Sequence, residues 1–259
     1  MIRDQLPFLQ RVHEVHLDGK AVSSDLLAEL ASLTSLERIS LKQAQFTDAG
    51  LKQLVGLTGL AGLYLNDTQV TDEGLVHLKG LTNLLHLHLG RTQVTDAGLN
   101  ELSGLTQLVG LNLNATQVTA NGLEHLKELS QLNALSLSGL PVTDAGLKHL
   151  KGFLNLGRLD LAHTQITDAG LRHFRDSKRL DELILRHTQV TDSGLQHLAG
   201  IAQLNFLDLG FTKVTDAGMT HLKGLTSLTR LDLEGTPVTA EGRAKLRKAM
   251  PGCSVTPDP

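Results

Sequence analysis

Thr92-Gln-Val-Thr-Asp-Ala-Gly-Leu-Asn-Glu101 is the stretch that decides the fold of this 259-residue chain, because near-copies of it return every 24 residues. The copies align without insertion or deletion into ten L-x-x-L-x-L segments. A fixed period in this range is typical of proteins that stack identical supersecondary structures. The sequence therefore predicts one continuous stack of repeats.

The repeat at residues 84–107 shows which local structure the pattern favours. Alternation within Leu87-His-Leu89 places both leucines on one face of a short strand. Thr95 can cap a helix N-terminus, and Asp96 stands where a negative charge favours the helix dipole. Gly98 leaves room for close packing between neighbouring repeats. Each repeat is thus predicted to contain a strand, a turn and a short helix.

Threonine recurs at the predicted cap position. Aspartate follows it in seven copies, and glycine stands three residues after it in every copy. We interpret this Thr-Asp pair as a helix start rather than a ligand site, because each copy lies where a cap is needed. The threonines are Thr47, Thr71, Thr95, Thr119, Thr143, Thr167, Thr191, Thr215 and Thr239.

The motif L-x-x-L-x-L-x-x-T-x-V-T-D-x-G-L resembles the leucine-rich repeat family over essentially the whole chain. It is similar to the bacterial 24-residue repeats of planctomycete-like genomes and to the cysteine-containing class of F-box proteins. It departs from the commonest class at position nine, where threonine mostly replaces asparagine. The resemblance implies a right-handed α/β solenoid with a parallel β-sheet on the concave face and short helices on the convex face. It also implies protein recognition on the concave face, and it transfers no catalytic residue.

The register predicts a single leucine-rich repeat domain over residues 1–259. Residues 1–11 are expected to form an N-terminal cap or a partial repeat, residues 12–250 the ten repeats, and residues 251–259 a C-terminal cap. A lone repeat buries too little apolar surface to fold, so neighbouring repeats must cover it.

Composition narrows the classes of partner and compartment. The net charge of −3 is mixed in sign and gives no reason to expect nucleic acid. No apolar run has the length of a membrane span. A lone cysteine, Cys253, suits a reducing compartment, so we expect a cytoplasmic protein. We also expect a monomer without a cofactor.

Two histidine patterns could suggest metal sites, and both are interpreted as surface residues. Six histidines share one helical slot, where neighbouring helices are expected to lie too far apart for a shared metal: His77, His125, His149, His173, His197 and His221. His163 and His187 follow adjacent strands, so they could bind an anion, or a metal with a third ligand, but a recognition surface is the preferred interpretation. No catalytic residue and no metal ligand is predicted.

The exposed strand positions of the second half are richer in charged and aromatic residues than those of the first half, where Tyr64, His86 and His88 are the exceptions. Aromatic residues beside arginines and carboxylates are typical of interface hot spots. The alternative is that Phe206 and Phe211 stack on each other or shield a strand edge. The predicted partner-binding residues are Arg158, Asp160, Ile184, Arg186, His187, Phe206, Asp208, Phe211, Arg230 and Asp232.

These observations favour a non-enzymatic scaffold that binds a protein or peptide on its concave face. The alternative is the substrate-recognition domain of a larger enzyme, such as a ubiquitin-ligase-like adaptor or a kinase. A purely structural spacer is the third hypothesis.

Overall fold

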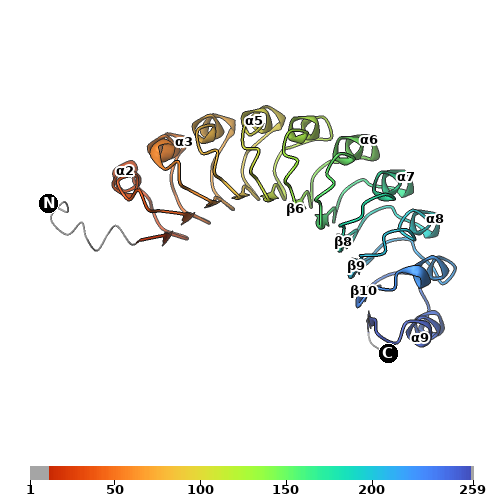
Figure 1. Ribbon diagram of the computed structural model, residues 1–259. Coiled ribbons are helices and arrows are strands. Elements are labelled where there is room, and N and C mark those ends of the chain that lie inside the picture. Colours follow the sequence, from red (N-terminus) through yellow and green to blue (C-terminus); the bar gives the residue numbers. More distant parts are fainter. Residues whose placement is uncertain (1–11, 258–259) are drawn as a thin grey trace. The chain divides into compact units, whose positions relative to one another are not determined.

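The structure is a computed structural model that describes residues 12–257. The chain falls into two compact units, unit one ending at Leu132 and unit two beginning at Asn133. In each unit the strands lie on one side of the repeats and the helices on the other (Figure 1). The cap or partial repeat predicted at residues 1–11 lies outside the described residues, and a single domain over residues 1–259 stays a prediction.

All strands run parallel and follow one another in chain order within each unit, which confirms the predicted sheet. Each strand is three residues long, and the expected eleventh strand is present at Val255. Unit one contains β1 Glu14–His16, β2 Arg38–Ser40, β3 Gly62–Tyr64, β4 His86–His88 and β5 Gly110–Asn112. Unit two contains β6 Ala134–Ser136, β7 Arg158–Asp160, β8 Glu182–Ile184, β9 Phe206–Asp208, β10 Arg230–Asp232 and β11 Ser254–Thr256.

The strands begin one residue earlier than the predicted L-x-L triplets. In β3, for example, the buried Leu63 is flanked by Gly62 and Tyr64, and Leu65 follows the strand. The amide of Leu65 nevertheless donates to the carbonyl of His88 on the next repeat at 2.8 Å. The pairing therefore extends beyond the assigned strand, and both leucines point into the core as predicted.

The helices are short, as predicted, and many continue as a 3-10 turn. Unit one contains α2 Ser24–Leu30, α3 Asp48–Leu51, η2 Lys52–Gly56, α4 Asp72–Leu75, η3 Val76–Leu78, α5 Asp96–Glu101 and η4 Gly122–Leu126. Unit two contains α6 Asp144–Leu147, η5 Lys148–Leu150, α7 Asp168–Leu171, η6 Arg172–Phe174, α8 Asp192–Leu195, η7 Gly218–Gly224 and α9 Ala240–Ala249.

The recurring aspartate that follows the cap threonine joins one repeat to the next. Asp72 accepts from the amide of Thr95 at 2.8 Å and from its hydroxyl at 2.6 Å. The Thr95 hydroxyl in turn accepts from the amide of Ala97 in the first turn of α5. We call this set of three bonds the Asp–Thr clamp. It is formed by seven aspartates: Asp48, Asp72, Asp96, Asp144, Asp168, Asp192 and Asp216.

The clamp also shows where the predicted cap bonds are missing. Thr47 and Thr143 occupy the N-cap position of α3 and α6, but their side chains accept no cap bond. The repeat before each has no aspartate in the clamp slot, which holds Ser24 and Ala120 instead. The prediction that all nine threonines cap through their side chains was therefore wrong at these two, because the hydroxyl is oriented by the aspartate of the preceding repeat.

The clamp explains the recurring glycine as well. A Cβ on Gly98 would lie 2.3 Å from the Oδ1 atom of Asp72. The glycine thus leaves room for the aspartate of the preceding repeat, which confirms the predicted close packing and gives it a specific neighbour.

Threonine at position nine is a buried residue with a satisfied hydroxyl. Thr92, for example, is 5% exposed, and its Oγ1 donates to the carbonyl of Leu89 at 2.6 Å. A buried hydroxyl without a partner is costly, so this bond allows threonine to occupy the slot.

A side chain of α9 contacts the last strand of the sheet, β11. The guanidinium of Arg247 donates to the carbonyls of Val255 and Pro257, each at 2.8 Å. These carbonyls lie in and just beyond β11, and an unpaired edge strand is a template for aggregation. Arg247 therefore satisfies carbonyls at this edge, and a C-terminal cap over residues 251–259 stays a prediction.

Candidate functional site on the strand face of unit two

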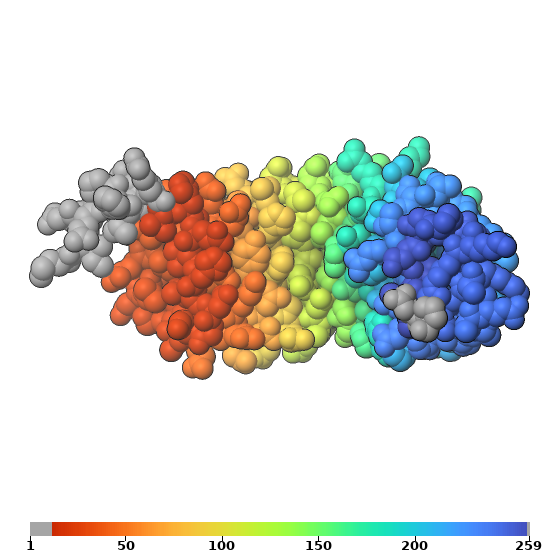
Figure 2. Space-filling view, turned by 90° about the horizontal axis from the view of Figure 1, so that it is seen from below, coloured from red at the N-terminus to blue at the C-terminus, as the bar shows by residue number. Residues whose placement is uncertain are grey.

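The predicted patch lies on one surface, which we call the unit-two strand face. It consists of the outward residues of β7 to β10 and the two residues that follow the next leucine of each repeat. Along one row, Asp160 is in register with Ile184, Ile184 with Asp208, and Asp208 with Asp232. The neighbouring row runs Arg158, Glu182, Phe206 and Arg230 in the same register. In the space-filling view, successive repeats appear as successive bands of colour (Figure 2).

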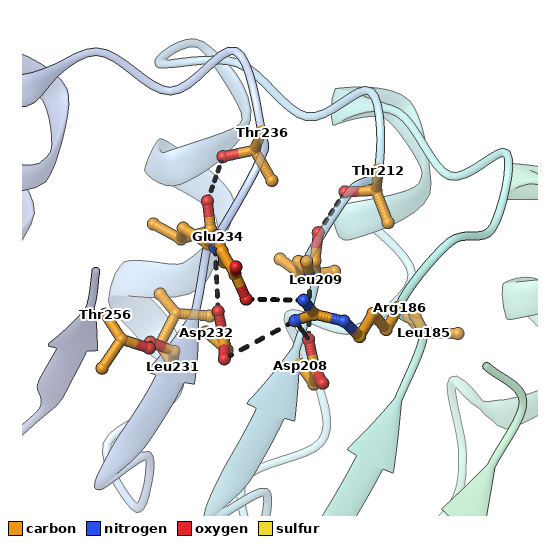
Figure 3. Close-up of polar contacts among 12 residues, drawn as sticks. Leu185, Arg186, Asp208, Leu209, Thr212, Leu231, Asp232, Glu234, Thr236 and Thr256 are labelled. Atoms are coloured by element: carbon orange, nitrogen blue, oxygen red, sulfur yellow. Dashed lines mark hydrogen bonds and ion pairs between the residues drawn. The ribbon is translucent and has the colours of Figure 1, made fainter. Parts of the chain in front are cut away.

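Arg186 is the centre of the polar contacts on this face (Figure 3). Its guanidinium donates to the carboxylate of Glu234, two repeats further on, at 2.5 Å. The same group lies 3.9 Å from Asp208 and 3.9 Å from Asp232. The hydrogen bond to Glu234 is the main reason that the pKa of Arg186 is raised. Three carboxylates thus share one guanidinium.

Asp208 is the most buried carboxylate of the face, at 9% exposure. Its Oδ1 atom accepts from the amide of Gly210 at 2.8 Å. Burial raises the pKa of Asp208, and the nearby charges of Asp232 and Asp160 raise it further, whereas the Gly210 bond and Arg186 lower it. The carboxylate therefore lies in an environment that disfavours its negative charge.

A stack of three rings borders the carboxylates. His163 and His187 stack with ring centroids 4.3 Å apart, and His187 and Phe211 stack at 4.4 Å with an interplanar angle of 9°. The guanidinium carbon of Arg186 lies 4.5 Å from the centroid of Phe211. Phe211 is still 42% exposed. Stacked rings at this spacing stabilise one another.

The rings belong to residues with a left-handed backbone. The φ angles of His163, His187 and Phe211 are 57°, 57° and 56°. Glycine fills the same slot in the next repeat, where Gly235 has φ 64°, and a Cβ there would lie 2.5 Å from the Phe211 ring. A bulky residue rarely adopts this conformation, so the slot exposes a ring at the cost of backbone strain.

Phe206 belongs to a different stack. The guanidinium carbon of Arg230 lies 4.6 Å from its ring centroid, and Phe206 is half-buried beneath it. The two phenylalanines therefore have different partners, and the alternative that they stack on each other is not what the structure shows.

The remaining predicted residues lie on β7 and β8. Arg158 forms an ion pair with Glu182. Asp160 accepts from the hydroxyl of Ser136 at 2.9 Å and from the amide of Ala162 at 3.0 Å. Ile184 is half-exposed between two aspartates. All ten predicted residues thus share one surface, although several are engaged with each other.

Beyond the predicted set, three more residues with a charged side chain or an aromatic ring belong to this surface: His163, Glu182 and Glu234. The 24-residue register could have revealed Glu234, which occupies the same slot as Arg186 two repeats later. It could not have shown that an arginine side chain reaches across two repeats, because this depends on how neighbouring charges compete for it.

The other candidates have structural environments. The six histidines that share a helical slot are half-buried on the helix side, and burial is the main reason that the pKa of His173 is lowered. Cys253 is buried, and burial raises the pKa of its thiol. Among residues 12–257, no group of three or more His, Cys, Asp or Glu could hold a metal ion. No helix in that range combines the length and the apolar character that crossing a bilayer requires.

Comparisons with known proteins agree with the repeat geometry. A family model described as "Leucine Rich repeat" matches residues 80–103, 154–174 and 224–246. A leucine-rich repeat protein of Leptospira interrogans is similar in structure, with a TM-score of 0.70 and 23% sequence identity over 91% of this chain. Internalin C2 of Listeria monocytogenes gives a TM-score of 0.65 and 24% identity, covering 84% of each chain.

These likenesses concern the fold. The chain spans 57% of the length of the Leptospira protein. No curated protein matches the sequence. What the unit-two strand face does must therefore be argued from its own residues.

Proposed function

We propose that the chain is a leucine-rich repeat protein that acts as a non-enzymatic scaffold and binds a protein or peptide on the unit-two strand face. Leucine-rich repeat domains typically bind proteins, which supports this class of function. Within it, we propose a cytoplasmic monomer without a cofactor.

The observation that carries the proposal is the exposed ring of Phe211. Phe211 is 42% exposed and has a left-handed backbone. Contact of its apolar ring with water is unfavourable, so the free energy falls when a partner covers the ring. The ring is bordered by Arg186, whose guanidinium lies 3.9 Å from the carboxylate of Asp208. Aromatic and arginine side chains with a polar rim are the composition of interface hot spots.

The face also combines order with accessibility. Arg186 is held by Glu234 and Phe211, and Phe206 is held by Arg230. Side chains that are already ordered lose less conformational entropy on binding than free ones. A partner would therefore meet a preorganised surface rather than mobile side chains.

The test is affinity capture with matched variants. Wild-type protein and the Phe206→Ala/Arg230→Ala variant are immobilised and exposed to a lysate, with His149→Ala on the helix side as the control. We expect bound proteins that the control retains and the double variant loses. The affinity loss for each single change should be about 2 kcal/mol or more. Equal capture by all three proteins would contradict the proposal.

A further inference from the structure

The unit-two strand face carries more negative than positive charge. Its carboxylates are Asp160, Glu182, Asp208, Asp232 and Glu234, whereas its guanidinium groups are Arg158, Arg186 and Arg230. Arg158 pairs with Glu182, and Arg230 lies over Phe206. The excess negative charge therefore gathers around Asp208, Asp232 and Glu234, where Arg186 is the shared counter-charge.

Arg186 leaves this excess incompletely neutralised. Its hydrogen bond goes to Glu234, and its distances of 3.9 Å to Asp208 and Asp232 are too long for hydrogen bonds. The amides of Gly210 and Glu234 donate to one oxygen of Asp208 and one of Asp232. Burial and repulsion from Asp232 and Asp160 disfavour the negative charge of Asp208. A second cation beside Asp208 and Asp232 would stabilise that charge.

The rings beside the carboxylates favour the same kind of partner. Phe211 and the two stacked histidines present exposed ring surface, and Phe211 contacts Arg186, the shared counter-charge of the aspartates. A cation near an aromatic ring is attracted by the ring quadrupole, and arginine also stacks on rings. Carboxylate and ring together thus suit a lysine or arginine side chain better than an acidic one, which the excess negative charge would repel.

Resting on the function proposed above, we infer that the partner is a protein segment rich in lysine or arginine, which places a basic side chain beside Asp208 and Asp232 and covers Phe211. The proposed occupant of the face is therefore a cationic peptide. Binding of a neutral or acidic peptide in its place would contradict the inference.

The first experiment is a selection from a library of random peptides on immobilised wild-type protein, counter-selected on Phe206→Ala/Phe211→Ala. We expect the peptides that depend on these two rings to be enriched in lysine and arginine. Ring-dependent peptides that are neutral or acidic would overturn the inference and leave the proposed function standing. The absence of any ring-dependent peptide would overturn both.

The second experiment titrates a fluorescent selected peptide against two variants of equal charge. Asp208→Asn/Asp232→Asn removes the two carboxylates from the face. The control, Asp176→Asn/Glu241→Gln, removes two carboxylates outside the face. Asp176 follows η6 and Glu241 lies in α9, and their side chains are 84% and 76% exposed. We expect at least about tenfold weaker binding for the first variant and little change for the second. Equal weakening would show general attraction to an acidic protein and overturn the inference.

The aspartate variants are designed to fold. Asn112 of unit one occupies the same slot as Asp208, and its Oδ1 atom accepts from the amide of Asn114 at 2.9 Å. Asparagine at positions 208 and 232 can therefore keep the backbone bond while it removes the charge.

Discussion

The strand faces of the two units are built on the same repeat and differ in what the outward residues do. On the unit-one strand face, defined by the same slots, the charges balance: Arg38, Lys42 and Arg91 against Glu14, Asp18 and Asp67. Arg91 pairs with Asp67 at 3.2 Å, and Arg38 with Glu14 at 3.8 Å. On the unit-two strand face, by contrast, one arginine is shared by three carboxylates.

Aromatic residues differ between the faces too. In unit one, Tyr64 meets His88 edge-on at 4.8 Å, and the ammonium of Lys42 lies 5.3 Å from the tyrosine ring. Burial is the main cause that lowers the pKa of His88, followed by electrostatic interaction with its neighbours His86 and Lys42. Unit two instead stacks three exposed rings. The comparison teaches that the repeat fixes the positions while the outward residues decide the chemistry.

The largest expected effect tests what the two units share, the Asp–Thr clamp. Gly98→Ala should destabilise the protein by about 2–3 kcal/mol, because the new Cβ displaces Asp72 and breaks its bonds to Thr95. Urea denaturation measures the loss.

The matched control is Gly104→Ala in the same repeat, where a Cβ would have no neighbour within 4 Å. That change should be neutral or stabilising by up to about 1 kcal/mol. In unit two, Gly218→Ala should resemble Gly98→Ala, because its Cβ would lie 2.3 Å from Asp192. Equal effects at positions 98 and 104 would contradict the clamp.

The next prediction separates stability from binding on the unit-two strand face. Phe211→Gly should weaken peptide binding by about 2 kcal/mol. Its folding stability should stay within about 1 kcal/mol of wild type, because glycine relieves the left-handed backbone while the ring contacts are lost.

Calorimetric titration and thermal unfolding of the same samples check this pair of outcomes. Ala115→Gly, in the same left-handed slot of unit one, serves as the control and should leave binding unchanged. Binding equal to wild type in the Phe211 variant would remove Phe211 from the site.

A smaller effect is expected from adding a clamp where unit one lacks it. Ser24→Asp places a carboxylate in the slot that precedes Thr47, whose side chain makes no cap bond. The new hydrogen bonds should stabilise the protein by about 0.5–1.5 kcal/mol. Measured against Thr47→Val alone, the gain should be smaller in Ser24→Asp/Thr47→Val, because valine keeps the backbone amide that donates to the aspartate but has no hydroxyl to orient. An undiminished gain in the double variant would show that the hydroxyl plays no part in the clamp.

The smallest effect concerns the pH dependence of the unit-two strand face. Because the folded-state pKa of Asp208 is raised, its charge destabilises the fold, and this cost is present above the folded pKa and lost as the pH falls through it. Asp208→Asn should therefore be as stable as wild type or slightly more stable at pH 7, by less than about 1 kcal/mol. The difference should shrink on acidification, which urea denaturation at pH 7 and pH 4 measures. A difference that grows on acidification would reverse the assigned sign.

The sequence alone determined the fold, the strand positions to within one residue, and the shared surface of the ten predicted residues on the unit-two strand face. A period of 24 residues places equivalent residues in register, so the spacing by itself assigns Asp160, Ile184, Asp208 and Asp232 to one row, and the strand pairing confirms it. The alternation of buried leucines then decided which side chains point outward.

Only the tertiary structure decided which of these side chains bind one another. Periodicity assigned Asp72 to its own helix, whereas the structure joins it to Thr95 of the next repeat. Likewise, Arg186 bonds Glu234 two repeats away, and Phe206 and Phe211 separate into two stacks. The physical reason is that the repeat register fixes the position of each Cα and Cβ atom. Side-chain length, rotamer and the competition among neighbouring charges decide which partner the end of the side chain contacts.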